Sequence, residues 1–268
     1  MKKPSVLIID DDSLFSEVIK TVISPFAEQV IHASSAENGI HFVSKDKPDF
    51  IFLDNRLPKL NGTDVIDLYK EISPESHIVL MSNTFLIDDV ADAINQKVDL
   101  VVAKRQLSEQ KISAILNSFR TTRKEDEPAY GNIFSLKNKE KEDGNRNIAI
   151  VDDDELFSFQ LNWVLNKLKR SASIDSISVY TDSKGLNSSF SQTIPDIIFL
   201  DYYLKETNAK YILKYLRKYA PDAKVIIVSS QDDPEIAIEL TELTVYGYIN
   251  KSGDWQARVA DYVEELAI

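Results

Sequence analysis

Short, continuous apolar runs alternate along the chain with longer segments in which apolar residues recur every three or four positions. Runs such as 6–9 and 197–200 consist entirely of Val, Ile, Leu and Phe. Strands of this composition are buried on both faces, which is typical of parallel sheets covered by helices. The segments 15–26 and 157–168 have the period of amphipathic helices. The pattern therefore predicts strands that alternate with helices along the whole chain.

The second half of the chain repeats the first. Residues 6–15 resemble residues 149–157, and residues 48–54 resemble residues 195–201. The offset between the copies is 142 residues at the first acidic cluster and 147 residues at the later matches. We therefore expect a five-residue insertion in the second copy, around residues 169–178.

Each copy contains five strand-then-helix units. We predict an α/β protein with two doubly wound (βα)5 domains of flavodoxin-like type, each with a five-stranded parallel sheet in strand order 2-1-3-4-5. The first domain is placed at residues 1–122, a charged linker at 123–146 and the second domain at 147–268. The linker is rich in Lys, Arg, Asp and Glu, which is typical of a solvated connection, and the alternative is that part of it continues the preceding helix.

The composition excludes several classes of function. The chain has 268 residues with 31 Lys and Arg against 43 Asp and Glu, a net charge of −12, which disfavours nonspecific binding to nucleic acid or anionic membranes. Cysteine is absent, so disulfides, thiolate zinc sites and cysteine nucleophiles are excluded. No secretion signal and no apolar segment of membrane-spanning length is visible, so we expect a cytoplasmic protein without membrane insertion. Only seven glycines occur and no Walker or dinucleotide pattern is found.

Polar residues that can carry chemistry follow directly after the predicted strands of the first copy. They are Asp10, Asp11, Asp54, Ser82 and Lys104. Because the carboxyl ends of parallel strands lie at one edge of the sheet, we expect these side chains to converge in a crevice there. Two carboxylates about 4 Å apart repel by ~4 kcal/mol at an effective dielectric constant near 20, so the cluster must hold a proton or a cation. Oxygen ligands without nearby His or Cys favour Mg²⁺.

The second copy has the same residue types at the equivalent positions, namely Asp152, Asp153, Asp201, Ser229 and Lys251. In such a site a carboxylate can attack a phosphoryl group to form an aspartyl phosphate. A metal ion and a lysine then neutralise the phosphoryl oxygens, and a hydroxyl donates a hydrogen bond. The alternative for Ser82 is a helix cap, and the alternative for Lys104 is a solvent-exposed position.

With these residues, each copy resembles a CheY-like response-regulator receiver domain of two-component signalling. The resemblance covers nearly all of the chain outside the linker. It implies that Asp54 and Asp201 accept the phosphoryl group and that Mg²⁺ is the cofactor. By the same resemblance, the other metal-binding acids are Asp10, Asp11, Asp152 and Asp153.

The resemblance also assigns the remaining positions of the two sites. The backbone carbonyls of Arg56 and Tyr203, two residues after each phosphoacceptor, are expected to complete the metal ligands. The switch hydroxyls and the phosphoryl-contacting lysines then correspond to Ser82, Ser229, Lys104 and Lys251.

The loop after the phosphoacceptor differs between the copies. The first copy keeps the proline and the glycine of the family pattern, as Pro58 and Gly62. The second copy has Lys205 and Ala209 at these positions. We therefore expect this loop to differ in shape between the two domains.

Two further positions depart from the family pattern. The aromatic residue that often reports activation corresponds to Tyr248 in the second copy but to Val101 in the first, so conventional aromatic switching is not expected in the first copy. Neither copy has the proline that commonly follows the lysine, because Arg105 and Ser252 stand there.

The last predicted helix, Trp255–Leu266, completes the second copy, and we expect no output domain in this chain. The sequence predicts a tandem-receiver regulator that accepts phosphoryl groups from a sensor histidine kinase or a histidine phosphotransfer protein. It would signal by binding a downstream protein and not nucleic acid, and a homodimer is compatible with the sequence. It is not expected to be an enzyme beyond its own phosphorylation and dephosphorylation.

Three alternatives stay open at this point. In the first, one copy, with the second copy favoured, is never phosphorylated and serves as a docking or dimerising module. In the second, the sequence is the front part of a longer regulator with an output domain. In the third, the chain is an enzyme that binds flavin or a phosphatase with an aspartate nucleophile. The third is disfavoured because such phosphatases need a second acid where Arg56 and Tyr203 stand.

Overall fold

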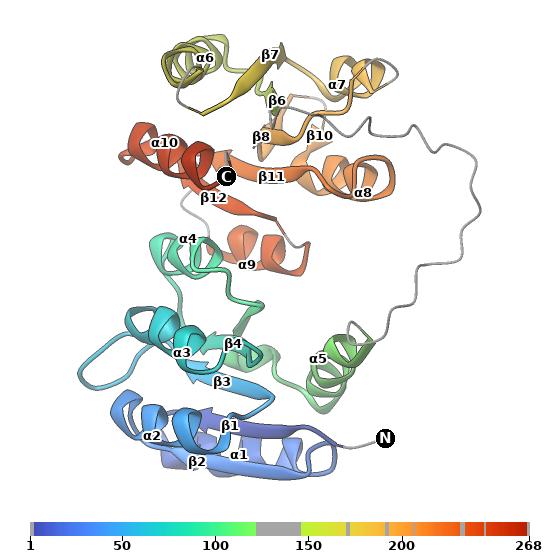
Figure 1. The fold of residues 1–268 in the computed structure, drawn as a ribbon. Coiled ribbons are helices and arrows are strands. Elements are labelled where there is room, and N and C mark those ends of the chain that lie inside the picture. Colours follow the sequence, from blue (N-terminus) through green and yellow to red (C-terminus); the bar gives the residue numbers. More distant parts are fainter. Residues whose placement is uncertain are drawn as a thin grey trace. The chain divides into compact units, whose positions relative to one another are not determined.

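The computed structural model describes residues 3–121, 146–169, 172–190, 193–205, 207–230, 234–243 and 245–266. These residues form two units, each built around one five-stranded parallel sheet (Figure 1). The predicted linker lies outside the described residues, except for Arg146, which begins the first strand of the second sheet. The alternative that the linker continues the preceding helix also falls outside them.

The first sheet has the strand order β2-β1-β3-β4-β5, which confirms the predicted order 2-1-3-4-5. Its strands are β1 (Ser5–Ile9), β2 (Gln29–Ala33), β3 (Phe50–Asp54), β4 (His77–Ser82) and β5 (Leu100–Ala103). Its helices are α1 (Ser13–Ile23), α2 (Ala36–Asp46), α3 (Ile66–Ile72), α4 (Ile87–Asn95) and α5 (Glu109–Thr121). Two short 3₁₀ helices, η1 (Gly62–Val65) and η2 (Lys104–Gln106), follow β3 and β5.

Both faces of the first sheet are buried, as the apolar runs predict. Successive side chains of a strand point to opposite faces. Phe50 and Phe52 of β3 therefore join one cluster with Ile19 of α1 and Ile112 of α5. The intervening residues Ile51 and Leu53 are equally buried on the opposite face. The apolar residues of the strands therefore form the core, and the polar residues at the strand ends lie outside it.

The second sheet has the strand order β7-β6-β8-β11-β12, which is the order of the first sheet in its own numbering. Its strands are β6 (Arg146–Val151), β7 (Ile174–Tyr180), β8 (Ile197–Asp201), β11 (Lys224–Ser229) and β12 (Gly247–Asn250). Its helices are α6 (Glu155–Leu168), α7 (Ser183–Ser189), α8 (Ala209–Tyr219) and α10 (Trp255–Leu266). Helix α9 (Pro234–Glu242) follows β11 in the chain. A short antiparallel hairpin that the sequence did not predict, β9 (Tyr203–Leu204) and β10 (Thr207–Asn208), follows β8.

The inserted residues of the second copy are shared between a helix and a strand. Helix α6 has 14 residues and its counterpart α1 has 11, while β7 has seven residues and β2 has five. The amide of Asp10 donates to Ala33 O, and the amide of Asp152 donates to Tyr180 O. The later offset of 147 residues is therefore reached at the end of β7. The predicted region 169–178 holds only part of the insertion, because the extension of α6 ends at Leu168. A register shift between Arg146 and Asn147 accommodates the longer strand.

The core of the second unit follows the same plan. Ile150 of β6 and Phe199 of β8 pack in one cluster with Leu161 of α6 and Val259 of α10. In the described part of the chain, none of the helices is both long and apolar enough to cross a bilayer.

Candidate functional site

The turns after β1 and β6 hold the first acid of each cluster in place. Strand β1 pairs in parallel with β3, so Asp10, which follows β1, lies beside the end of β3. Its carboxylate accepts a hydrogen bond from the amide of Asp12 at 2.9 Å, and Asp12 in turn caps α1 by accepting from the amides of Leu14 and Phe15. Because these bonds fix the strand-to-helix turn, the position of the Asp10 carboxylate is defined before any ligand binds.

Three carboxylates of each unit converge at the carboxyl edge of its sheet. Ligand atoms of the members lie within 4.8 Å of one another in both clusters. The cluster of the first unit consists of Asp10, Asp11 and Asp54, and that of the second unit consists of Asp152, Asp153 and Asp201. The structure thus brings together all six acids that the sequence singled out.

A buried lysine faces the acids of the first unit. The Nζ atom of Lys104 lies 2.6 Å from Asp10 Oδ2 and 2.9 Å from Asp54 Oδ2, and the lysine side chain is only 5% exposed. The alternative of a solvent-exposed Lys104 is therefore wrong. One ammonium stands against three carboxylates, so the cluster keeps an excess of negative charge.

Lys251 has the same role in the geometry of the second unit. Its Nζ atom lies 2.7 Å from Asp152 Oδ2 and 3.3 Å from Asp201 Oδ1. The Lys251 side chain is 12% exposed, so this cluster is slightly more open than that of the first unit. The two units repeat the arrangement of charges as well as the fold.

Burial dominates the electrostatics of the first cluster. It raises the pKa of Asp10 and of Asp54 above the ordinary value, even though hydrogen bonds from Lys104 oppose this change. Burial alone would lower the pKa of Lys104, but its hydrogen bonds to the two carboxylates prevail and raise it. The lysine therefore stays charged, while the carboxylates gain from an additional proton or cation.

The acids of the second cluster behave alike. Burial raises the pKa of Asp201 to about 6, against the attraction of Lys251. Burial also raises the pKa of Asp152, opposed first by its hydrogen bond with Lys251. An unliganded second site therefore holds its negative charge at a cost in folding free energy.

Each lysine also lies over an aromatic ring of an apolar helical stripe, a contact that the sequence did not predict. Lys104 Nζ is 4.6 Å from the ring centroid of Phe15, and Lys251 Nζ is 4.6 Å from that of Phe157. Cation–π contacts of this kind favour a desolvated ammonium. The signal available in the sequence was the recurrence of Phe at the same place in both copies, four residues after Asp11 and four residues after Asp153.

The two predicted switch serines are buried at the ends of β4 and β11. Ser82 Oγ donates to Thr84 O at 2.8 Å. Helix α4 begins only at Ile87 with Leu86 at its N-cap, so Ser82 does not cap it and that alternative is wrong. In the second unit the carbonyl of Ser229 accepts a hydrogen bond from the amide of Lys251 at 2.9 Å.

Arg56, whose backbone carbonyl is predicted to bind the metal ion, connects the loop after Asp54 to neighbouring residues. The Arg56 amide donates to Asp54 Oδ1 at 3.2 Å. The Arg56 side chain forms an ion pair of 2.6 Å with Asp89 of α4 and a hydrogen bond with Asn61. The sequence did not predict this link between the loop and α4, because it depends on the path of a long side chain.

The corresponding loop of the second unit has a different structure. Arg56 and Asn61 form a single antiparallel bridge in the first unit. In the second unit two residue pairs make the hairpin β9–β10. Tyr203, whose backbone carbonyl is predicted to bind the metal ion, is the first residue of that hairpin. The expected difference in loop shape is thus visible in the backbone.

Gly62 shows why the first loop follows its path. A Cβ atom at this position would lie 2.6 Å from the backbone oxygen of Asp54, which is closer than atoms tolerate. The Gly62 amide donates to Asn55 O at 2.8 Å, and the amide of Ala209 makes the equivalent bond to Tyr202 O. The second loop keeps this hydrogen bond but must leave room for the alanine side chain.

The donor atoms of both clusters suit Mg²⁺. They are carboxylate oxygens, with no sulfur or imidazole in either cluster. Magnesium prefers a few carboxylates supplemented by water and phosphate oxygens. The excess of carboxylates over ammonium groups supplies the electrostatic attraction for a divalent cation.

Comparison with known proteins identifies one family for both halves of the chain. The sequence profile of the response regulator receiver domain matches residues 6–117 and again residues 148–261. The nitrate/nitrite response regulator protein NarL of Escherichia coli is 31% identical over 113 residues, which cover 41% of this chain and 52% of that protein. The transcriptional regulatory protein DegU of Brevibacillus brevis is 28% identical over 145 residues, covering 47% of this chain and 61% of that protein. The match thus spans about half the length of these curated relatives.

Two solved structures are similar to part of the chain. The signal receiver domain of the putative response regulator NarL from Mycobacterium tuberculosis has a TM-score of 0.42 at 22% identity, and the match covers 45% of this chain and 98% of that one. A receiver domain protein (CheY-like) from Methanospirillum hungatei has a TM-score of 0.41 at 19% identity, covering 46% of this chain and 98% of that one.

Proposed function

The chain belongs to the response regulator receiver family and carries two receiver domains in tandem, and we propose that each domain accepts a phosphoryl group on its buried aspartate. In this proposal Asp54 and Asp201 are the phosphoacceptors. The phosphorylated state then changes the affinity of the chain for a downstream protein.

One observation carries the proposal, namely that the same arrangement of three acids and one buried lysine occurs in both units. In each unit one acid ends the central strand of the sheet, and the lysine lies within 3.3 Å of that acid. A structural ion pair would need only one acid for each lysine. Three acids with one lysine suit a site that receives both a divalent cation and a phosphoryl group.

The chemical step is a transfer between a nitrogen and an oxygen. A carboxylate oxygen of Asp54 attacks the phosphorus atom of a phosphohistidine, so a P–O bond forms as the P–N bond breaks. The histidine nitrogen leaves with the electron pair of that bond. Lys104 lies beside the acceptor oxygen, where its charge can neutralise a phosphoryl oxygen, and Asp201 and Lys251 are placed in the same way.

Mg²⁺ bound by the acids would neutralise the equatorial oxygens of the transferred group. The residues that would hold it are Asp10, Asp11 and Asp54 with the carbonyl of Arg56 in the first unit. In the second unit they are Asp152, Asp153 and Asp201 with the carbonyl of Tyr203. Attack of water on the acyl phosphate in the same site would return the free aspartate, and we propose that the chain catalyses no reaction beyond its own phosphorylation and dephosphorylation.

The partners follow from the chemistry of the step. We propose a sensor histidine kinase or a histidine phosphotransfer protein as the donor and a protein as the downstream target. Two-component donors of this kind act in the cytoplasm, where we place the chain. No role in binding nucleic acid is proposed, and homodimerisation is a further outcome to measure in the phosphorylated state.

Intact-mass measurement tests the proposal. The whole chain is incubated with Mg²⁺ and acetyl phosphate, and the number of added phosphoryl groups is counted in the wild type, Asp54→Asn and Asp201→Asn. We expect two additions in the wild type and one in each variant. Asp261→Asn, a neutralisation on the exposed face of α10, serves as the control and should keep both additions. A folded chain that gains none would contradict the proposal. A single addition that Asp54→Asn removes and Asp201→Asn does not would leave the second domain as a docking module.

A further inference from the structure

The loop of the second site has a lysine where the loop of the first site has a proline. Lys205 stands four residues after Asp201, and Pro58 stands four residues after Asp54. Proline has no backbone N–H, so the first loop cannot donate a hydrogen bond from this position. A lysine offers both the N–H and an ammonium group.

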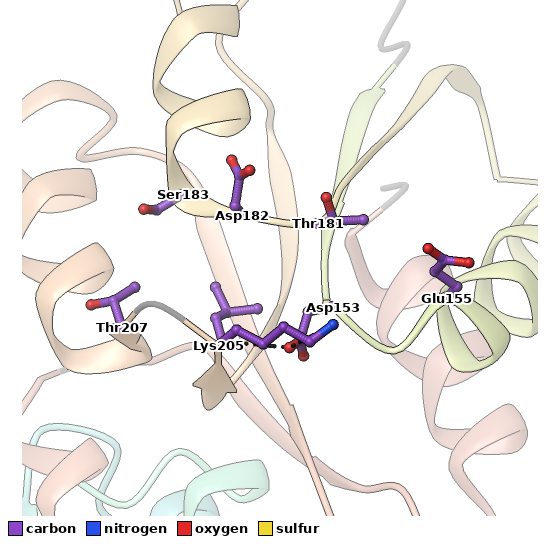
Figure 2. A pocket seen from close by; sticks show the side chains of 8 residues that line it. Asp153, Glu155, Thr181, Asp182, Ser183, Lys205 and Thr207 are labelled. Atoms are coloured by element: carbon purple, nitrogen blue, oxygen red, sulfur yellow. Dashed lines mark hydrogen bonds and ion pairs between the residues drawn. The ribbon is translucent and has the colours of Figure 1, made fainter.

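Both groups of Lys205 reach the metal-site acid Asp153. The backbone N–H of Lys205 donates to Asp153 Oδ2 at 3.2 Å. The ammonium lies 3.8 Å from the same oxygen. Figure 2 draws both residues and marks their contact with dashes. The side chain of Asp153 is 18% exposed and that of Lys205 is 81% exposed, so the ammonium approaches the acid from the solvent side.

A cavity opens at this place. It has a volume of about 230 Å³, and Asp153 and Lys205 contribute to its wall together with Glu155 and Asp182. Figure 2 shows the Lys205 side chain extended across to Asp153. The ammonium and the carboxylate lie on the wall of the same cavity, so a cation bound by Asp153 would meet the charge of Lys205.

From this geometry, and on the basis of the proposed function, we infer that Lys205 competes with Mg²⁺ for Asp153, so that the second domain binds Mg²⁺ more weakly than it would with proline. Phosphorylation of the second domain then requires a higher Mg²⁺ concentration than it would without this lysine.

The expected effect is modest because Lys205 is exposed. Exposed ion pairs at this distance change an equilibrium by about two- to fivefold, and salt screens them. We therefore expect Lys205→Met to tighten Mg²⁺ binding by the second domain about two- to fivefold at low ionic strength. The gain should shrink when the ionic strength rises to about 0.3 M, where the Debye length is well under 10 Å.

The two tryptophans give a readout that does not depend on activity. Both Trp163 and Trp255 belong to the second copy. The Trp255 ring lies 4.9 Å from Phe157, whose ring contacts Lys251 of the site. With Trp163→Phe as background in the full chain, Trp255 emission is followed as MgCl₂ is added at constant ionic strength, and calorimetry gives an independent dissociation constant.

Matched variants separate the local contact from general charge. Lys214→Met removes one exposed lysine from α8 and should leave the dissociation constant within about 1.5-fold of the wild type. Lys205→Pro removes the N–H as well as the ammonium and should tighten binding at least as much as Lys205→Met. Pro58→Lys, measured with Asp201→Asn present, should weaken Mg²⁺ binding by the first domain about two- to fivefold.

Equal Mg²⁺ affinity for Lys205→Met and the wild type at low ionic strength would overturn the inference and leave the proposed function intact. Absence of any Mg²⁺ response in emission and in calorimetry would contradict the proposed function itself, and the inference with it. Tightening by Lys205→Met and by Lys214→Met to the same extent would also overturn it, because the effect would then be one of net charge.

Discussion

Neutralising Asp201 should stabilise the second unit when no metal is bound. Burial raises the pKa of this carboxyl from 3.8 to about 6. At pH 7.5 the carboxyl is charged in both states, and the charge costs more free energy in the folded state than in the unfolded chain. A difference of about two pKa units corresponds to ~3 kcal/mol, which is the upper limit of the effect. Because asparagine has the shape of aspartate without its charge, we expect Asp201→Asn to increase the free energy of unfolding by about 1–3 kcal/mol.

Urea denaturation in EDTA measures this change. Both tryptophans lie in the second copy, so their emission follows the unfolding of the second unit in the intact chain. Mg²⁺ at ten times its dissociation constant should stabilise the wild type by about 1.4 kcal/mol, and Asp201→Asn by much less. The two proteins should therefore approach each other in stability as Mg²⁺ is added.

Asp261→Asn is the control for this measurement, because Asp261 is exposed on α10 and its neutralisation should change the free energy of unfolding by less than about 0.5 kcal/mol. If Asp201→Asn destabilises the unit in EDTA, the attraction of Lys251 outweighs the burial of the acid. The electrostatic reasoning for the whole cluster would then be wrong.

Three further predictions concern the charges and the packing of the two units. In EDTA, the free energy of unfolding of the second unit should fall as the pH rises from about 4 to 7. The reason is that, below the Asp201 pKa of about 6, the folded state binds more protons than the unfolded chain. Urea titrations across this pH range should show this slope in the wild type and a smaller slope in Asp201→Asn. Lys104→Met leaves two buried carboxylates without their ammonium and should destabilise the first unit by about 3 kcal/mol, with partial recovery in Mg²⁺. Far-UV circular dichroism follows the unfolding. An unchanged unfolding midpoint would show that the ion pairs make no net contribution to stability. Gly247→Ala should destabilise the second unit by about 1–3 kcal/mol in the same urea assay, because a Cβ there overlaps the Tyr262 ring, and wild-type stability would refute this reading of the packing.

The sequence predicted the fold because its signals repeat and agree with one another. Apolar runs of strand length and helical stripes occur in the same order twice, and the two sheets have the predicted order of strands. The hairpin β9–β10 was missed because it contains only two residue pairs, and no apolar alternation marks so short a strand.

The acids and lysines of the site could be predicted because they stand at the ends of apolar strands, where the topology of the sheet brings them together. Asp54 and Lys104 follow apolar strands that are two apart in the sheet, so their meeting depends on topology alone. Contacts made by long or flexible side chains could not be predicted in this way. The reach of Arg56 to Asp89, and the contact of Lys205 with Asp153, depend on rotamers that no periodicity records.

The central claim is that one buried aspartate in each domain becomes an aspartyl phosphate. The most direct measurement is site mapping of the intact chain after incubation with Mg²⁺ and acetyl phosphate, followed by borohydride reduction, which converts an aspartyl phosphate to homoserine, and peptide mass spectrometry. The account predicts homoserine at positions 54 and 201 only, and none when Mg²⁺ is replaced by EDTA. Homoserine at other aspartates, or at neither position in a folded chain, would contradict it.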